Sequence, residues 1–156
     1  MAIKGQSLFP MFTMAQVFKR IEAFKADAND RMVASLAYVG ETVVNAAREN
    51  EAVSYKNQTG NLRSSIGYTI TYDGAILFDN IKPARSDDGG KGTSTAHDWV
   101  QENAKIIHEP NKFVLTVFAG MEYAAAVEFH KYDVISGSTL QAPQLIKEFK
   151  DKLGIQ

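Results

Sequence analysis

One stretch decides the fold of this chain, and it reads Ile66-Gly67-Tyr68-Thr69-Ile70-Thr71-Tyr72-Asp73-Gly74. Large side chains alternate with small ones up to Tyr72, which is the pattern of a half-buried strand. Asp73-Gly74 is a favoured pair for a tight type I′ turn. The stretch therefore predicts a β-hairpin whose return strand runs from Ala75 to about Ile81.

Upstream of this hairpin the sequence has the pattern of a long amphipathic helix. Thr13 and Gln16 have the spacing of a capping box, and apolar residues then recur at helical spacing to about Glu49. Such a helix is roughly 50 Å long. It is either continuous, bent near Gly40 or broken near Ala28-Asn29. On so small a protein it must extend beyond its own core or fold back, and in the first case its apolar stripe needs a partner.

The sequence downstream of the hairpin contains shorter elements. We expect a flexible loop at about 82–93, a helix from Ser94 or Thr95 to about Asn103, a strand at 105–108, a strand from Phe113 that ends at Gly120, a helical turn within 121–129, a loop or short edge strand at 134–139, and a helix over 140–153. Pro143 fits the first turn of that last helix, and Gly154 fits its end.

These elements predict an α+β fold. The long N-terminal helix and the C-terminal helix pack on one face of a small, mostly antiparallel β-sheet. Residues 1–12 are expected to form an extended arm, and residues 13–156 a single α+β domain. A chain of 156 residues is close to the common size of one domain.

Composition excludes several classes of function. The net charge of −1 gives no strong basic field that would gather nucleic acid. The chain has no cysteine, which excludes disulfides, thiolate metal ligands and a cysteine nucleophile. Residues 1–10 have one lysine and no long apolar core, so we expect no signal peptide. No apolar run reaches the roughly 20 residues of a membrane span.

Residues with catalytic potential are few. None of the histidines, His97, His108 and His130, has a second histidine at the i, i+4 spacing of helical metal sites. Glu128 and His130 lie close enough in sequence to suggest acid–base chemistry, which makes a small hydrolase one alternative function. The run from Asp87 to Thr93 lacks the spacing of a phosphate-binding loop. We therefore expect no enzyme activity, no cofactor and no metal.

Two segments resemble a known family. The first is Tyr55-Lys56-Asn57-Gln58-Thr59-Gly60-Asn61-Leu62-Arg63-Ser64-Ser65-Ile66, and the second is Ala119-Gly120-Met121-Glu122-Tyr123-Ala124-Ala125-Ala126-Val127-Glu128-Phe129. Both are similar to motifs of the neck and tail-completion (head–tail joining) proteins of siphophage-type tailed bacteriophages, as is Ala142-Pro143 before a final amphipathic helix. Where that family usually has Gly-Thr after Glu-Phe, this chain has His130-Lys131.

The resemblance implies a role for specific residues. Gly60 lets the chain turn between helix and strand, Leu62 and Ile66 anchor that turn, and the resemblance implies that Arg63 pairs with Glu128 to join the two motifs. We interpret these positions as structural or interface residues rather than catalytic ones. The full set is Thr59, Gly60, Leu62, Arg63, Ile66, Tyr123, Ala124, Glu128 and Phe129.

The function implied by the resemblance is assembly. The chain would be a structural virion protein, made in the host cytoplasm and located at the head–tail junction. Its partners would be copies of itself in a ring, together with neighbouring neck, tail-terminator or tail-tube proteins. DNA would be only passing cargo, and no membrane would be involved. A hydrolase using His130 and Glu128, or a host-directed binding module, is the alternative.

Overall fold

The computed structural model describes residues 12–49, 59–83, 89–107, 109–130 and 132–153. The chain divides into two compact units, Met1–Met32 and Val33–Gln156. The division falls inside the first helix. The single domain from residue 13 onward stays a prediction. The predicted N-terminal arm lies outside the described residues except for Phe12.

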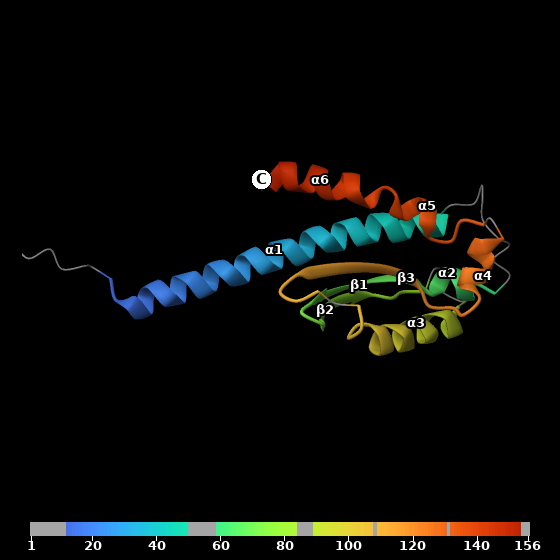
Figure 1. Cartoon of the computed structure of the whole chain (residues 1–156), viewed down its shortest axis with the longest axis horizontal. Coiled ribbons are helices and arrows are strands. Elements are labelled where there is room, and N and C mark those ends of the chain that lie inside the picture. The colour runs from blue at the N-terminus through green and yellow to red at the C-terminus, as the bar shows by residue number, and fades with distance from the viewer. Residues whose placement is uncertain (1–11, 50–58, 84–88, 108, 131, 154–156) are drawn as a thin grey trace, which may run out of the picture. The chain divides into compact units, whose positions relative to one another are not determined.

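The elements follow each other in a mixed order (Figure 1). They are α1 (Met14–Glu49), α2 (Asn61–Ser64), β1 (Ile66–Tyr72), β2 (Ala75–Asn80), α3 (Gly90–Asn103), β3 (Phe113–Ala119), α4 (Ala124–Phe129), α5 (Ser136–Thr139) and α6 (Ala142–Leu153). The predicted α+β class is therefore confirmed, with a long N-terminal helix, a small antiparallel sheet and a C-terminal helix.

The sheet has three strands in the order β2-β1-β3, and both pairings are antiparallel. β1 is the central strand and is buried from Ile66 to Thr71. Asp73 and Gly74 both have positive φ, of 50° and 80°, as the predicted type I′ turn requires. Between β1 and β2 the register shifts after Ile70, so Leu77 is an extra residue that bulges from the edge strand.

α1 begins where the sequence predicted. The Gln16 N–H donates to Thr13 Oγ1 at 3.3 Å, and the Thr13 N–H donates to Gln16 Oε1 at 2.9 Å, which together form a capping box. The helix is a single element to Glu49. The six buried residues of α1 lie between Ser35 and Ala47, all in the second unit.

The two faces of the sheet are covered by different helices. On one face, Val44 of α1 packs with Ile66, Tyr68 and Ile70 of β1. On the other face, α3 supplies Ala96, Val100 and Trp99 against Phe118, and Figure 1 shows α3 across the sheet from the second half of α1. The Trp99 and Phe118 rings stack with their centroids 4.6 Å apart, and this contact joins α3 to β3.

Polar contacts also fasten α1 to the sheet. Arg48 Nη2 donates to Ile66 O at 2.6 Å and to Lys82 O at 2.9 Å. Burial lowers the pKa of Arg48 below its ordinary value, although the nearby charge of Glu41 offsets part of this shift. Asn80 at the end of β2 donates to Glu41 Oε2. The end of α1 is thus joined to the start of β1 and to the residues that follow β2.

Several of the shorter elements differ from the prediction. α3 begins at Gly90, so the last part of the predicted 82–93 loop is helical, and residues 84–88 lie outside the described residues. The predicted strand at 105–108 is wrong, because residues 105–107 form turns after α3. The 134–139 segment contains the helical turn α5 rather than an edge strand. The predicted helix over 140–153 is α6, and its Phe149 ring lies 5.5 Å from the Tyr38 ring of α1.

Candidate protein-interaction surface

The described part of the first resemblance motif, residues 59–66, forms a tight turn that leads into β1, and residues 55–58 lie outside the described residues. Gly60 has a φ of 70°, in the left-handed region that favours glycine, and it precedes α2. The Ser64 N–H donates to Gly60 O at 3.0 Å and closes the turn. Leu62 and Ile66 are almost completely buried, whereas Thr59 is exposed. These contacts agree with the sharp, anchored turn that the sequence predicts at Gly60.

The second resemblance motif forms α4 and the turn before it. Ala124 is buried at the start of the helix, while Tyr123 is exposed. Phe129 at the end of α4 is 86% exposed. One aromatic side chain of this motif therefore lies almost entirely in solvent, where an apolar ring gains nothing from the fold itself.

The two motifs lie side by side in the structure. Ile66 is the register partner of Ala119 across the β1–β3 pair, and the Gly120 N–H donates to Ser65 O at 3.0 Å. Leu62 and Ala124 belong to the same core cluster. The segments that carry the family resemblance thus form one structural unit, although they are distant in sequence.

Glu128 fastens the chain that follows α4. Its Oε2 accepts the N–H of Val134 at 2.9 Å and of Ile135 at 3.4 Å, and its Oε1 accepts the N–H of Ser136 at 3.1 Å. Burial raises the pKa of Glu128, but hydrogen bonds from the Ser136 side chain and from these three backbone groups outweigh burial, so the pKa is lowered from its ordinary value of 4.5. Asp133 Oδ1 accepts the Gly137 N–H at 2.8 Å in the same segment.

These contacts bear on the hydrolase alternative and on the predicted Arg63–Glu128 pair. Both oxygens of Glu128 are already bonded to backbone, and a carboxylate with a lowered pKa is a weak general base. His130 is exposed, and its ring lies 6.1 Å from the Phe129 ring. The Arg63–Glu128 pair implied by the resemblance stays a prediction, because the described contacts of Glu128 are those with residues 134–136.

Within the described ranges, no group of three or more His, Asp or Glu side chains is arranged to hold a metal ion. Among the same residues, no helix combines the length and apolar character that a bilayer span needs.

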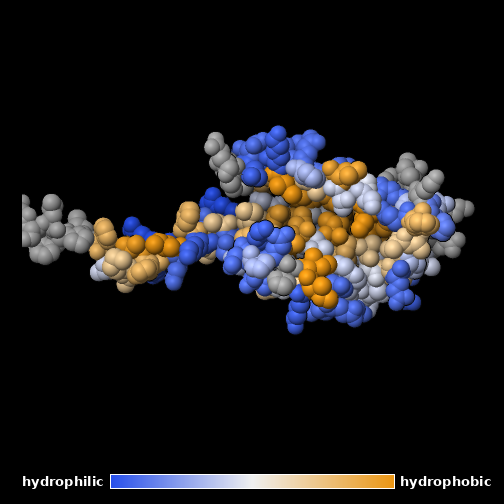
Figure 2. Space-filling view, in the orientation of Figure 1, coloured by the Kyte–Doolittle hydropathy of each residue, from blue (hydrophilic) through white to orange (hydrophobic). Residues whose placement is uncertain are grey.

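The first unit presents an apolar surface that we call the α1 stripe. It consists of Met14, Phe18, Ile21, Phe24 and Met32, whose spacing places them along one side of the helix. Their exposed fractions run from 37% for Met32 to 73% for Phe24. Figure 2 shows apolar side chains gathered along this first half of α1.

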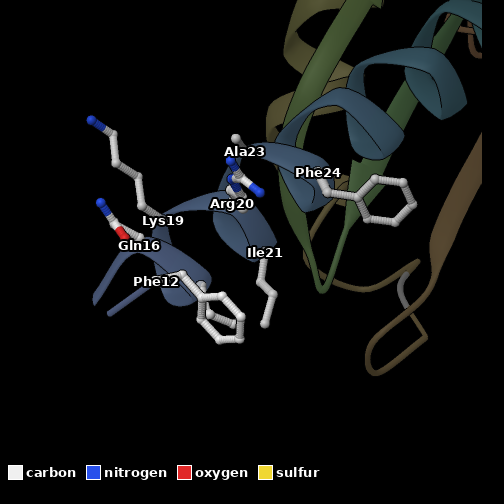
Figure 3. A pocket seen from close by; sticks show the side chains of 8 residues that line it. Phe12, Gln16, Lys19, Arg20, Ile21, Ala23 and Phe24 are labelled. Carbon is white, nitrogen blue, oxygen red and sulfur yellow. The ribbon is translucent and has the colours of Figure 1, made fainter. Parts of the chain in front are cut away.

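The surroundings of the α1 stripe are open rather than enclosed. Figure 3 shows Ile21, Phe24 and the preceding Phe12 pointing to one side, with Gln16 and Lys19 pointing to the other. The described side chains line a shallow depression, and all of them are exposed except the half-buried Val17. Such a surface suits another protein surface better than a small molecule, which prefers an enclosed cavity.

A second apolar surface lies on the hairpin, and the sequence analysis did not single it out. We call Tyr72, Ile76, Leu77 and Phe78 the hairpin patch, and their exposed fractions run from 36% to 48%. Ile76 pairs with Thr71 and Phe78 with Ile70, so the patch combines side chains from both faces of the sheet at its edge. The available signal was the unbroken apolar run Ala75-Ile76-Leu77-Phe78, because a strand with one solvated face alternates. Arg48 was also missed, since an arginine at a helix end usually has a solvated role.

The chain matches no protein-family model, no curated protein and no solved structure.

Proposed function

We propose that this protein is a structural assembly protein of a tailed bacteriophage, a neck or tail-completion subunit that forms a ring at the head–tail junction. It would act by binding alone, through contacts with copies of itself and with neighbouring neck, tail-terminator or tail-tube proteins. DNA would pass through the ring as cargo. The subunit would be assembled in the host cytoplasm and located in the virion.

The observation that carries this proposal is the α1 stripe. Large apolar side chains that recur along one helix and stay exposed are costly in water, and contiguous apolar patches of this kind mark interaction sites. An assembly subunit covers such a surface when it meets its neighbours. The resemblance motifs support the same proposal, because the packing of the Gly60 turn against α4 gives them a shared structural role.

A particle-based experiment tests the proposed function. Tailed particles from cells that carry the gene would be purified, probed with antibody against this chain and imaged by immunogold electron microscopy. We expect label at the head–tail junction. Deleting the gene should leave separate heads and tails, and supplying the intact gene in trans should restore joining. Joined particles without the gene, or particles without the protein, would refute the proposal.

A further inference from the structure

We propose that the ring contact is heterologous, with the α1 stripe of one copy packed on the β1–β2 hairpin of the next copy. The inference rests on the proposed ring, because it names the surfaces that build it. Each chain carries both surfaces, so every copy offers one stripe and one hairpin. Two different surfaces that bind each other produce a chain of subunits, and this chain closes into a ring when the rotation between copies allows it.

The charges around the two surfaces are complementary. The helix segment that carries the α1 stripe, residues 14 to 32, contains four basic and three acidic residues, and the basic excess lies in its first part, with Lys19, Arg20 and Lys25 against Glu22. The hairpin segment from residue 66 to 80 contains two aspartates and no basic residue. The basic first part of the stripe therefore attracts the acidic hairpin.

The apolar areas of the two surfaces are also adequate. An aromatic side chain presents about 150–250 Å², and Phe18 and Phe24 are each more than half exposed. Together with the hairpin patch, the area available for burial is on the order of 1,000 Å², which is the lower end for specific protein interfaces. A contact of this size is weak for one pair of copies and is reinforced when a ring closes.

The geometry of the hairpin favours a helix as its partner. β2 is an edge strand whose residues 75–78 are all exposed, and unpaired edges are commonly covered by a helix or loop. The bulge at Leu77 interrupts the ladder and disfavours a neighbouring strand in this position. Side chains from a helix do not need an unbroken ladder, because they contact the strand through its apolar groups.

A mixing experiment with two variants of the full chain tests this inference. The stripe variant is Phe18→Glu with Phe24→Glu, and the hairpin variant is Leu77→Lys. All three side chains are exposed, so each variant should keep the wild-type circular dichroism and thermal midpoint. Mass in solution would be measured by light scattering or sedimentation at concentrations up to about 1 mM, where contacts of only 4 kcal/mol are populated.

The expected results are specific to a heterologous contact. Wild-type protein should form species larger than a dimer, and each variant alone should be a monomer. An equal mixture of the two variants should give a dimer and nothing larger, because one intact stripe meets one intact hairpin. If the hairpin variant still dimerises alone, stripes pair with stripes and the inference is wrong. Wild-type protein that stays monomeric at every concentration also refutes it.

A charge exchange provides a second test that spares the apolar side chains. Arg20→Glu and Asp79→Lys should each weaken self-association about tenfold, and the double variant should recover most of the loss. If the double variant loses as much affinity as the two single variants combined, Arg20 and Asp79 do not face each other across the contact, and the inference is contradicted.

The two proposals fail separately. Self-association as described, together with absence from particles, would refute only the phage function. Presence at the head–tail junction without any stripe–hairpin contact would refute only this inference.

Discussion

Gly40 is the point of closest approach between α1 and the sheet. A Cβ at this position would lie 2.6 Å from ring atoms of Tyr68, which is shorter than any normal contact. The Tyr68 ring is buried and also lies 6.0 Å from the Phe78 ring, so it has little room to move. Gly40 therefore serves close packing within a continuous helix.

Replacing Gly40 with alanine should destabilise the protein. Overpacking against Tyr68 costs more than the roughly 1 kcal/mol of helix propensity that alanine adds, and we expect a net loss of about 1–2 kcal/mol in the free energy of unfolding. Gly90→Ala is the matched control, because a Cβ there meets nothing within 4 Å. Urea titration of both variants measures the difference, and equal midpoints would contradict this account of Gly40.

Glu128 gives stability a dependence on pH. Its folded pKa is lowered, so its contribution is fully present above the ordinary, unfolded pKa of 4.5 and disappears as the pH falls through the lower folded pKa. Glu128→Gln should cost about 1 kcal/mol at pH 7, a modest value because solvent screens a partly exposed group. Thermal unfolding should show that the stability difference between wild type and Glu128→Gln becomes smaller below about pH 4. A stability difference that does not depend on pH would rule out the Glu128 charge as its cause.

At the scale of elements, the sequence predicted best where the pattern was long. The bounds of α1 could be predicted because its apolar period continues for ten turns and the Thr13–Gln16 box marks its start. The hairpin was predicted from alternation and Asp73-Gly74. Both signals are local in the sequence, so they can be recognised without knowledge of tertiary contacts.

The elements that were missed depend on contacts with distant parts of the chain. The glycines before Thr93 were interpreted as loop residues, but Gly92 is where α3 meets α2, since a Cβ there would lie 1.9 Å from Asn61 O. The first turn of α5 depends on side-chain contacts that periodicity does not report, because the N–H groups of Ser136 and Gly137 donate to Glu128 and Asp133. The hairpin patch was missed because an unbroken apolar run also fits a strand that the fold itself buries on both faces.

The attachment of α1 to the sheet depends strongly on Arg48. Arg48→Ala would leave the carbonyl groups of Ile66 and Lys82 without their donor, and we expect a loss of about 2 kcal/mol in the free energy of unfolding. Arg20→Ala removes an exposed arginine from the same helix and should change the free energy of unfolding by less than about 0.5 kcal/mol. Chemical denaturation compares them, and similar losses would show that the Arg48 bonds add no stability.

At the scale of the whole molecule, stability should be distributed unevenly along α1. Its residues from 14 to 32 are exposed apart from Val17, whereas buried residues recur from Ser35 onward. Helical hydrogen bonds without tertiary packing open readily in water.

Hydrogen exchange should reveal this difference within one helix. In the unassembled protein, amides of residues 18–32 should exchange at least tenfold faster than those of residues 35–47. On self-association the first group should become protected, while the second changes little. The stripe variant provides the control, since it should gain no protection. Uniform exchange along α1 in the free protein would contradict the expected difference.

The bulge at Leu77 has a consequence for how copies of this protein come apart. When edge strands of successive copies pair with each other, the sheet can extend indefinitely into fibrils, which dissociate very slowly. One surplus residue in β2 spoils the alignment that such growth requires. Concentrated solutions of this protein should therefore stay clear and negative for amyloid dyes, and any complexes should dissociate on dilution.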